Sequence, residues 1–174
     1  MKIKEVIVNL NQMRADGVID NYAIGGAVGA TFYLEPTATL DVDVFIDFKS
    51  EPGRLLADPK HVFDYLVAHG GKLEGEHVVI AGWPVQFLPP TGPLVEEALA
   101  QAVTMDIEGT PSRVFTAEHL AAIALQTGRA KDKARLLQFV EAGALDAKRF
   151  EAILAKHGLL DQWHKFDRQF LKEG

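Results

Sequence analysis

Two aspartates separated by a single residue stand in a segment where polar and apolar residues alternate. Asp41 and Asp43 lie within Thr39-Leu-Asp-Val-Asp-Val-Phe-Ile-Asp-Phe48, whose alternation and β-branched content predict a strand with one buried face. Side chains alternate along a strand, so both carboxylates project to one side, about 7 Å apart. Such a pair offers the hard oxygen ligands that suit Mg²⁺, which also binds substrate phosphates. Asp47 continues the same face, so a solvated acidic stripe is the alternative interpretation.

A glycine pair precedes the aspartates, at the junction of an expected strand and an expected helix. Gly25 and Gly26 follow the short apolar run that starts at Tyr22 and precede the helical pattern of residues 26–34. Glycines at such a junction let the backbone approach a ligand closely and aim N–H groups of a helix start at an anion. The sequence therefore predicts an anion site beside the acidic pair.

Four cations fall within seven residues in the second half of the chain: Arg129, Lys131, Lys133 and Arg135. On a helix, Lys131 and Arg135 share a face and could together reach a triphosphate. An ordinary charged helix face, with Asp132 pairing with the neighbouring arginines, is the alternative.

The charge is distributed unevenly. Residues 1–112 carry 7 basic and 16 acidic side chains, a net of −9, whereas residues 113–174 carry 11 and 8, a net of +3, which together give the formal −6 of the chain. The acidic half contains the aspartate pair and the basic half contains the cation cluster, so the overall charge conceals two opposed regions.

Composition excludes several classes of protein. With 174 residues, 48% hydrophobic and 24% charged, the chain fits one soluble globular domain with an appended helical segment. No apolar stretch approaches the ~20 residues of a membrane span, and the start lacks a signal peptide's apolar region, so we expect a cytoplasmic protein with no membrane partner. The absence of cysteine excludes disulfides and thiol nucleophiles. The histidine and serine spacings do not support a zinc site or a serine hydrolase.

The hydrophobic periodicity changes from mixed to purely helical along the chain. This order predicts an α+β fold, with residues 1–112 as an α+β core and residues 113–174 as a helical segment packed on it. Expected helices are 3–16, 26–34, 58–69, 94–102, 116–127, 131–142, 146–157 and 160–171, and expected strands are 22–25, 39–48, 77–81, 84–88, 104–107 and 112–115, with residues 82–83 as a hairpin turn.

The order strand, Gly-Gly, helix, strand with Asp-x-Asp is that of the nucleotidyltransferase superfamily, the polymerase-β-like fold with a mixed β-sheet flanked by helices. Ile24-Gly25-Gly26-Ala27 followed by Thr39-Leu40-Asp41-Val42-Asp43-Val44 resembles the small bacterial proteins related to the AbiEii toxins. The agreement in order and spacing extends from about Tyr22 to Leu88. The segment from Leu125 to Arg135 resembles the Gly-Arg-x-Lys-Asp segment of the same proteins.

The resemblance implies a role for each motif. The protein would bind Mg-NTP and transfer a nucleotidyl group to a hydroxyl acceptor, which could be a small molecule, a tRNA end or a protein. Asp41 and Asp43 would hold Mg²⁺ beside the triphosphate, and Thr39 would be a secondary contact. The nucleotide phosphates would be bound by Gly25, Gly26, Arg129, Lys131 and Arg135.

One position departs from the superfamily's pattern. A later strand usually contributes a third carboxylate to the catalytic group, and Gln86 stands where it is expected. An amide is a neutral ligand and cannot act as a general base near neutral pH. The replacement candidates rest on chemistry alone, without a spacing argument: Glu35, Asp47, Glu74, Glu76 and His77.

Gln86 also supports a different class of function. The chain would then be a catalytically impaired nucleotidyltransferase fold that serves as a nucleotide-binding or partner-binding regulatory module, as in a toxin–antitoxin pair. A second copy of the chain or a cognate antitoxin would be the partner in that case.

Overall fold

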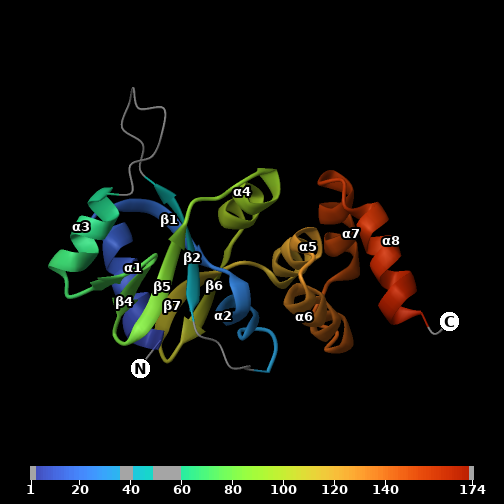
Figure 1. Cartoon of the computed structure of the whole chain (residues 1–174), viewed down its shortest axis with the longest axis horizontal. Coiled ribbons are helices and arrows are strands. Elements are labelled where there is room, and N and C mark those ends of the chain that lie inside the picture. Colours follow the sequence, from blue (N-terminus) through green and yellow to red (C-terminus); the bar gives the residue numbers. More distant parts are fainter. Residues whose placement is uncertain (1–2, 36–40, 49–59, 173–174) are drawn as a thin grey trace.

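The computed structural model of the protein describes residues 3–35, 41–48 and 60–172. Within them, seven strands form one mixed sheet with the order β3-β4-β5-β2-β1-β7-β6 (Figure 1). The strands are β1 (Ile19–Ile24), β2 (Val42–Phe48), β3 (Lys72–Glu74), β4 (His77–Ile80), β5 (Trp83–Leu88), β6 (Val103–Ile107) and β7 (Thr110–Val114).

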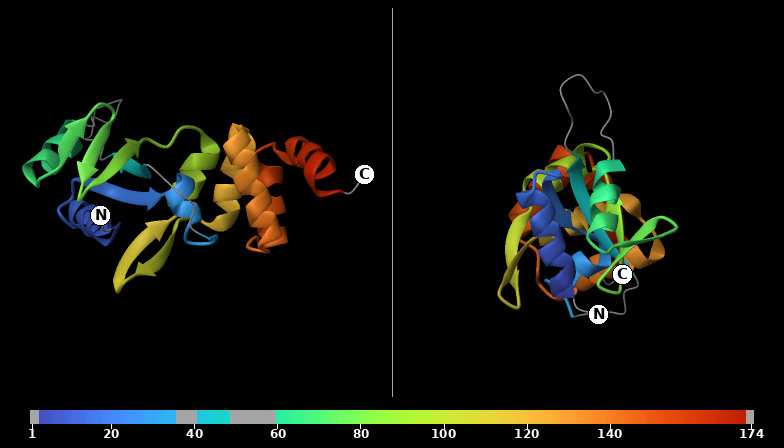
Figure 2. Two further views of the ribbon diagram at one scale, coloured as in Figure 1. Left: turned by 60° about the horizontal axis from the view of Figure 1, so that its bottom comes forward. Right: turned by 90° about the vertical axis from the view of Figure 1, so that its left-hand side faces the viewer.

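Helices cover both faces of the sheet and gather at one of its ends, as the views in Figure 2 also show. None of the helices within the described residues is long and apolar enough to cross a bilayer. They are α1 (Ile3–Ala15), α2 (Gly26–Ala30), α3 (Lys60–Ala68), α4 (Pro93–Ala100), α5 (Ala117–Thr127), α6 (Ala130–Glu141), α7 (Ala147–Lys156) and α8 (Leu160–Phe166), which continues as the π-helical segment η1 (Asp167–Leu171).

Strand β2 lies at the centre of the sheet. It pairs in parallel with β5 and antiparallel with β1, and β1 pairs in parallel with β7. The alternation predicted for this strand is observed: Val42, Val44 and Ile46 are fully buried. The residues between them therefore project from the opposite face of the sheet, where the candidate site lies.

Two apolar clusters cover the two faces. One packs the buried stripe of α1 and residues of α3 against the valines and isoleucines of β1, β2, β4 and β5. The other joins α4, α5, α6 and α7 to Ala23 of β1 and Ala30 of α2. Because this second cluster contains residues from both halves of the chain, the C-terminal helices share their core with the sheet rather than forming a separate one.

Several predicted boundaries differ from the observed ones. The hairpin turn between β4 and β5 consists of Ala81 and Gly82, both with positive φ (51° and 83°), so that Trp83 starts β5 instead of belonging to the turn. Helix α2 ends at Ala30, because Phe32 and Tyr33 donate to carbonyls three residues back and form turns. Strand β3 was not expected; its three residues are exposed and show no alternation.

The second half begins with a capped helix. The Thr116 hydroxyl accepts a hydrogen bond from the His119 amide and starts α5, while β7 extends to Val114, across the expected boundary at 112/113. The first residues of two expected elements, the strand 39–48 and the helix 58–69, lie outside the described residues.

Candidate functional site

Asp43 occupies the centre of the candidate site. It lies on β2, half-buried, and its Cα is the register partner of Gln86 on the parallel strand β5. Asp41 directly precedes β2 and 46% of its side chain is exposed. Both aspartates flank the fully buried Val42, so their side chains share the sheet face opposite that valine. The structure thus brings the predicted third position beside the aspartate pair, with an amide in place of a carboxylate.

The glycine pair is packed against the same aspartate. The Gly25 amide donates to the carbonyl oxygen of Asp43 at 3.0 Å, which ties the end of β1 to β2. At Gly26, φ is +58°, and a Cβ would lie 2.4 Å from Asp43 Oδ2. Gly26 is therefore required both for its left-handed backbone and for the close approach of the carboxylate. The Gly25 amide was expected to bind a phosphate, and in the structure it donates its hydrogen bond to a protein carbonyl oxygen.

Charges from two segments of the chain act on Asp43. Burial and the neighbouring Asp41 raise the pKa of its carboxyl group. Cations of the second half of the chain oppose this increase in pKa: Lys131, Arg135 and Arg129. The basic cluster and the acidic pair, far apart in the sequence, thus lie within electrostatic reach of each other.

The start of α6 holds two of these cations in place. Gly128 ends α5 in the left-handed conformation, and the Asp132 carboxylate then accepts hydrogen bonds from the amide and from Nε of Arg129, the latter at 2.7 Å. Arg135 Nη1 lies 3.8 Å from the other oxygen of Asp132. The pairing of Asp132 with the arginines, expected as the alternative to a phosphate site, is therefore present. This pairing orients the guanidinium groups of Arg129 and Arg135. Lys131, on the same helix, is exposed.

His77 is the replacement candidate that contacts the aspartate pair. Its Nε2 lies 3.4 Å from Asp41 Oδ2. Glu74 is the register partner of His77 on β3 and is exposed, as are Glu35 and Glu76. Asp47 lies further along β2, where burial and Asp20 raise its pKa. The predicted contact Thr39 lies outside the described residues.

The oxygen-donor set fits a magnesium ion that a substrate helps to bind. No group of three or more histidine or carboxylate side chains within residues 3–35, 41–48 and 60–172 is gathered as a complete metal cage. Mg²⁺ is usually bound by one or two carboxylates together with substrate phosphates and water. Asp41 and Asp43, with the Gln86 amide adjacent, match that pattern, and burial together with Asp41 raises the pKa of Asp43.

A second cluster of charged groups joins α4, α5 and α7. The sequence did not indicate this cluster. Glu97 Oε2 accepts hydrogen bonds at 3.0 Å from Nε2 of both His119 and His157. Thr116 Oγ1 lies 2.7 Å from Nδ1 of His119, which is completely buried. These residues lie on different helices and have no motif spacing, so the sequence alone could not reveal the contact.

Burial and hydrogen bonding act in opposite directions on these groups. Burial favours a raised pKa for Glu97, but hydrogen bonds from Lys156, His119 and His157 outweigh it and lower the pKa to about 2. Burial lowers the pKa of His119, although Glu97 opposes this decrease. The cluster is therefore a neutral histidine and a charged glutamate that connect three helices.

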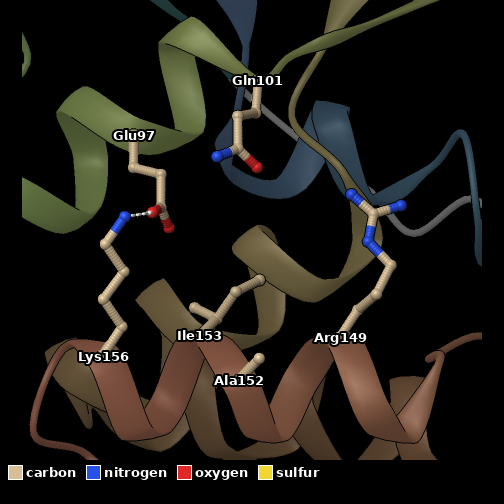
Figure 3. A pocket seen from close by; sticks show the side chains of 6 residues that line it. All are labelled: Glu97, Gln101, Arg149, Ala152, Ile153 and Lys156. Atoms are coloured by element: carbon tan, nitrogen blue, oxygen red, sulfur yellow. Dashed lines mark hydrogen bonds and ion pairs between the residues drawn. The ribbon is translucent and has the colours of Figure 1, made fainter.

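A small cleft adjoins this cluster between α4 and α7 (Figure 3). Its volume is about 210 Å³, below the ~300–1,000 Å³ of typical ligand pockets. Its lining contains none of the predicted site residues: Glu97, Gln101, Arg149, Ala152, Ile153 and Lys156. The ion pair between Lys156 and Glu97 spans it, so this cleft is a junction between helices rather than the candidate site.

Comparison with known proteins bears on the fold. No family model and no curated protein sequence matches this chain. An antigenic nucleotidyltransferase-like protein from Paracoccidioides brasiliensis is similar in structure, with a TM-score of 0.57 and 17% identity over 80% of this chain and 74% of its own. ANT(2'')-Ia in complex with adenylyl-2''-tobramycin gives a TM-score of 0.56 and 15% identity over 90% of this chain and 97% of its own.

The solution structure of the antibiotic-resistance factor ANT(2'')-Ia gives a TM-score of 0.54 and 16% identity over 93% of this chain and 96% of its own. These similarities confirm the predicted α+β fold: the chain has a nucleotidyltransferase-like mixed sheet flanked by helices.

Proposed function

We propose that the protein binds an NTP together with Mg²⁺ and transfers a nucleotidyl group to a hydroxyl acceptor. The observation that carries this proposal is the position of Asp43. Its carboxylate lies against Gly26, its strand position is beside Gln86, and three cations from the start of α6 act on it. A negative group close to three positive ones suits a metal ion and a polyphosphate bound together.

Each side chain has a role that follows from its chemistry. Asp41 and Asp43 would hold the magnesium ion, which would supply positive charge to offset the negative charge that develops during transfer. Lys131, Arg129 and Arg135 bind phosphate oxygens, and Asp132 keeps the two guanidinium groups oriented. Of the two glycines, Gly26 binds the phosphates, through its amide at the start of α2.

The reaction joins the acceptor oxygen to the α-phosphorus, breaks the bond between that phosphorus and the bridging oxygen, and releases pyrophosphate. The acceptor hydroxyl loses a proton in this step. Gln86, next to Asp43, cannot accept it. The proton therefore passes to water or to a group on the substrates, and transfer is expected to be slower than with a carboxylate at this position.

A second candidate function is favoured by the same residue. With an amide beside the aspartate pair, the site would bind nucleotide without transferring it efficiently, and the protein would act as a nucleotide- or partner-binding module. The relationship to the AbiEii toxins rests on the sequence motifs alone. The same is true of a cognate antitoxin as partner.

The acceptor is proposed from the chemistry of the surface. A chain with a net charge of −6 lacks the basic character expected for binding a long nucleic acid, which favours a small molecule, a protein side chain or a short tRNA end. The structure of ANT(2'')-Ia with an adenylylated tobramycin makes aminoglycosides a sensible first set of acceptors.

The test is label transfer. The purified protein is incubated with Mg²⁺ and each α-labelled NTP in the presence of aminoglycosides, RNA or a protein extract. Transfer that disappears in Asp43→Asn supports the enzyme, whereas nucleotide binding without transfer to any acceptor supports the binding module. Absence of both nucleotide binding and transfer would contradict the enzyme and the nucleotide-binding module.

A further inference from the structure

His77 has a buried nitrogen atom that makes no hydrogen bond. Its Nε2 is buried and makes no hydrogen bond, and its contact with Asp41 Oδ2, at 3.4 Å, has only the length of an ion pair. That distance exceeds the ~2.7–3.2 Å of an N–H···O hydrogen bond. Buried polar atoms in proteins are nearly always satisfied, so this nitrogen needs an explanation.

The distance fits a pair of ligands on one ion. Metal ligands of this kind bind at about 2.0–2.1 Å, so two neighbouring ligands of one tetrahedral or octahedral ion lie about 2.9–3.4 Å from each other. The observed 3.4 Å between Nε2 and Oδ2 is at the upper end of this range. This distance is too long for a hydrogen bond, but it is compatible with a cation between the two atoms.

The sheet places His77 on the correct face. Val78, the next residue of β4, is fully buried and pairs with Val85, which in turn pairs with Val42. These valines point to the buried face, so His77 points to the opposite face, together with Asp43 and Gln86. A side chain from the strand beyond β5 therefore reaches the aspartate pair across the position where a carboxylate is missing.

We propose that His77 is a metal ligand that shares one divalent cation with Asp41, a role that rests on the proposed function. Phosphate oxygens and water complete the coordination of this ion. An imidazole nitrogen favours first-row transition ions over Mg²⁺, which prefers oxygen. The site is therefore expected to prefer Mn²⁺ or Co²⁺ to Mg²⁺.

The test detects the nitrogen directly. Mn²⁺ alone is added to the full chain, its binding is titrated by the loss of the aqueous electron paramagnetic resonance signal, and electron spin echo modulation reports any directly bound ¹⁴N. The wild-type protein is expected to show ¹⁴N modulation, and His77→Ala is expected to lose it and to bind Mn²⁺ about tenfold more weakly, equal to about 1.4 kcal/mol. His164→Ala, at an exposed histidine of α8, is the matched control and is expected to retain both.

The outcomes separate the two proposals. Mn²⁺ binding that depends on Asp43 but shows no ¹⁴N modulation, or modulation that persists in His77→Ala, would overturn the role of His77 and leave the proposed function intact. No binding of Mn²⁺ or Mg²⁺, either alone or with a non-hydrolysable NTP, would overturn the proposed function as well. If His77→Ala does not fold, the absence of ¹⁴N modulation from the wild-type spectrum would still overturn the role of His77.

Discussion

The Oδ2 atom of Asp43 lies so close to the backbone of Gly26 that a Cβ at this glycine would be 2.4 Å from it. The first residue of α2 and the start of the central strand therefore touch without an intervening side chain. Because the Gly25 amide also donates to the Asp43 carbonyl oxygen, the turn after β1 fixes both the backbone and the carboxylate of this aspartate.

We expect Gly26→Ala to destabilise the protein and to weaken nucleotide binding. The left-handed conformation costs an alanine about 1–2 kcal/mol, and the methyl group must displace Asp43. Gly75 is a matched control, because it has nearly the same φ (+60° against +58°) and nothing within 4 Å of its Cβ position. Urea unfolding and NTP titration of both variants separate backbone strain from displacement. Equal nucleotide affinity in the two variants would contradict the proposed role of Asp43.

We expect Asp43→Asn to stabilise the ligand-free protein slightly and to abolish its stabilisation by Mg-NTP. Burial and Asp41 raise the pKa of Asp43, so the unfolded chain loses this proton first as pH rises above 3.8. The cost to stability grows from there and is fully present above the raised pKa. The asparagine removes that cost but also removes a metal ligand, which should weaken Mg-NTP binding at least about tenfold, or about 1.4 kcal/mol.

Asp47→Asn is the control for this prediction, because Asp47 lies on the same face of β2 and its pKa is also raised. Thermal melts with and without Mg-NTP compare the variants. The increase in Tm should persist in Asp47→Asn, and its persistence in Asp43→Asn would argue against metal binding by the pair.

We expect Lys131→Ala to weaken NTP binding roughly tenfold or more, because a hydrogen bond to a charged group contributes about 1.5–3 kcal/mol. Lys133 is two residues further along α6 and so faces nearly the opposite direction, which makes Lys133→Ala a matched control for charge and helix propensity. Isothermal titration at two salt concentrations measures both affinities. Equal losses in the two variants would indicate a general electrostatic effect instead of a specific contact.

We expect Glu97→Gln to lower stability at pH 7 by about 1–2 kcal/mol, because hydrogen bonds from two histidines and Lys156 lose their charged acceptor. In the wild type, the Glu97 pKa of about 2 contributes stability that is present above pH 4.5 and lost as pH falls towards 2. The lowered pKa of His119 adds a further loss of stability, which begins as pH falls through 6.5. The reason is that the unfolded chain protonates this imidazole before the folded chain does.

Glu97→Gln should accordingly lose less stability between pH 4.5 and 3 than the wild type. Glu96→Gln, at an exposed residue of the same helix, should keep the wild-type profile. Chemical denaturation across this pH range provides the comparison. A wild-type pH profile in Glu97→Gln would show that the cluster does not couple the helices.

Much of the fold follows from local patterns in the sequence. The alternation in β2, the periodicity of α1 and the C-terminal helices, and the cap at Thr116 each depend on neighbours along the chain, and the structure contains all of them. The chemical types at the candidate site, an aspartate pair, a glycine pair and a cation cluster, are equally local. The sequence by itself therefore determined which groups are available and on which elements they stand.

Only the tertiary structure decided which of these groups meet. The parallel register of β2 and β5 places Gln86 beside Asp43, and the Asp43 carbonyl takes the Gly25 amide. Packing across strands brings His77 to Asp41, and packing across helices joins Glu97 to His119. Such contacts depend on strand register and side-chain packing between distant segments, and residue spacing along a single chain contains neither.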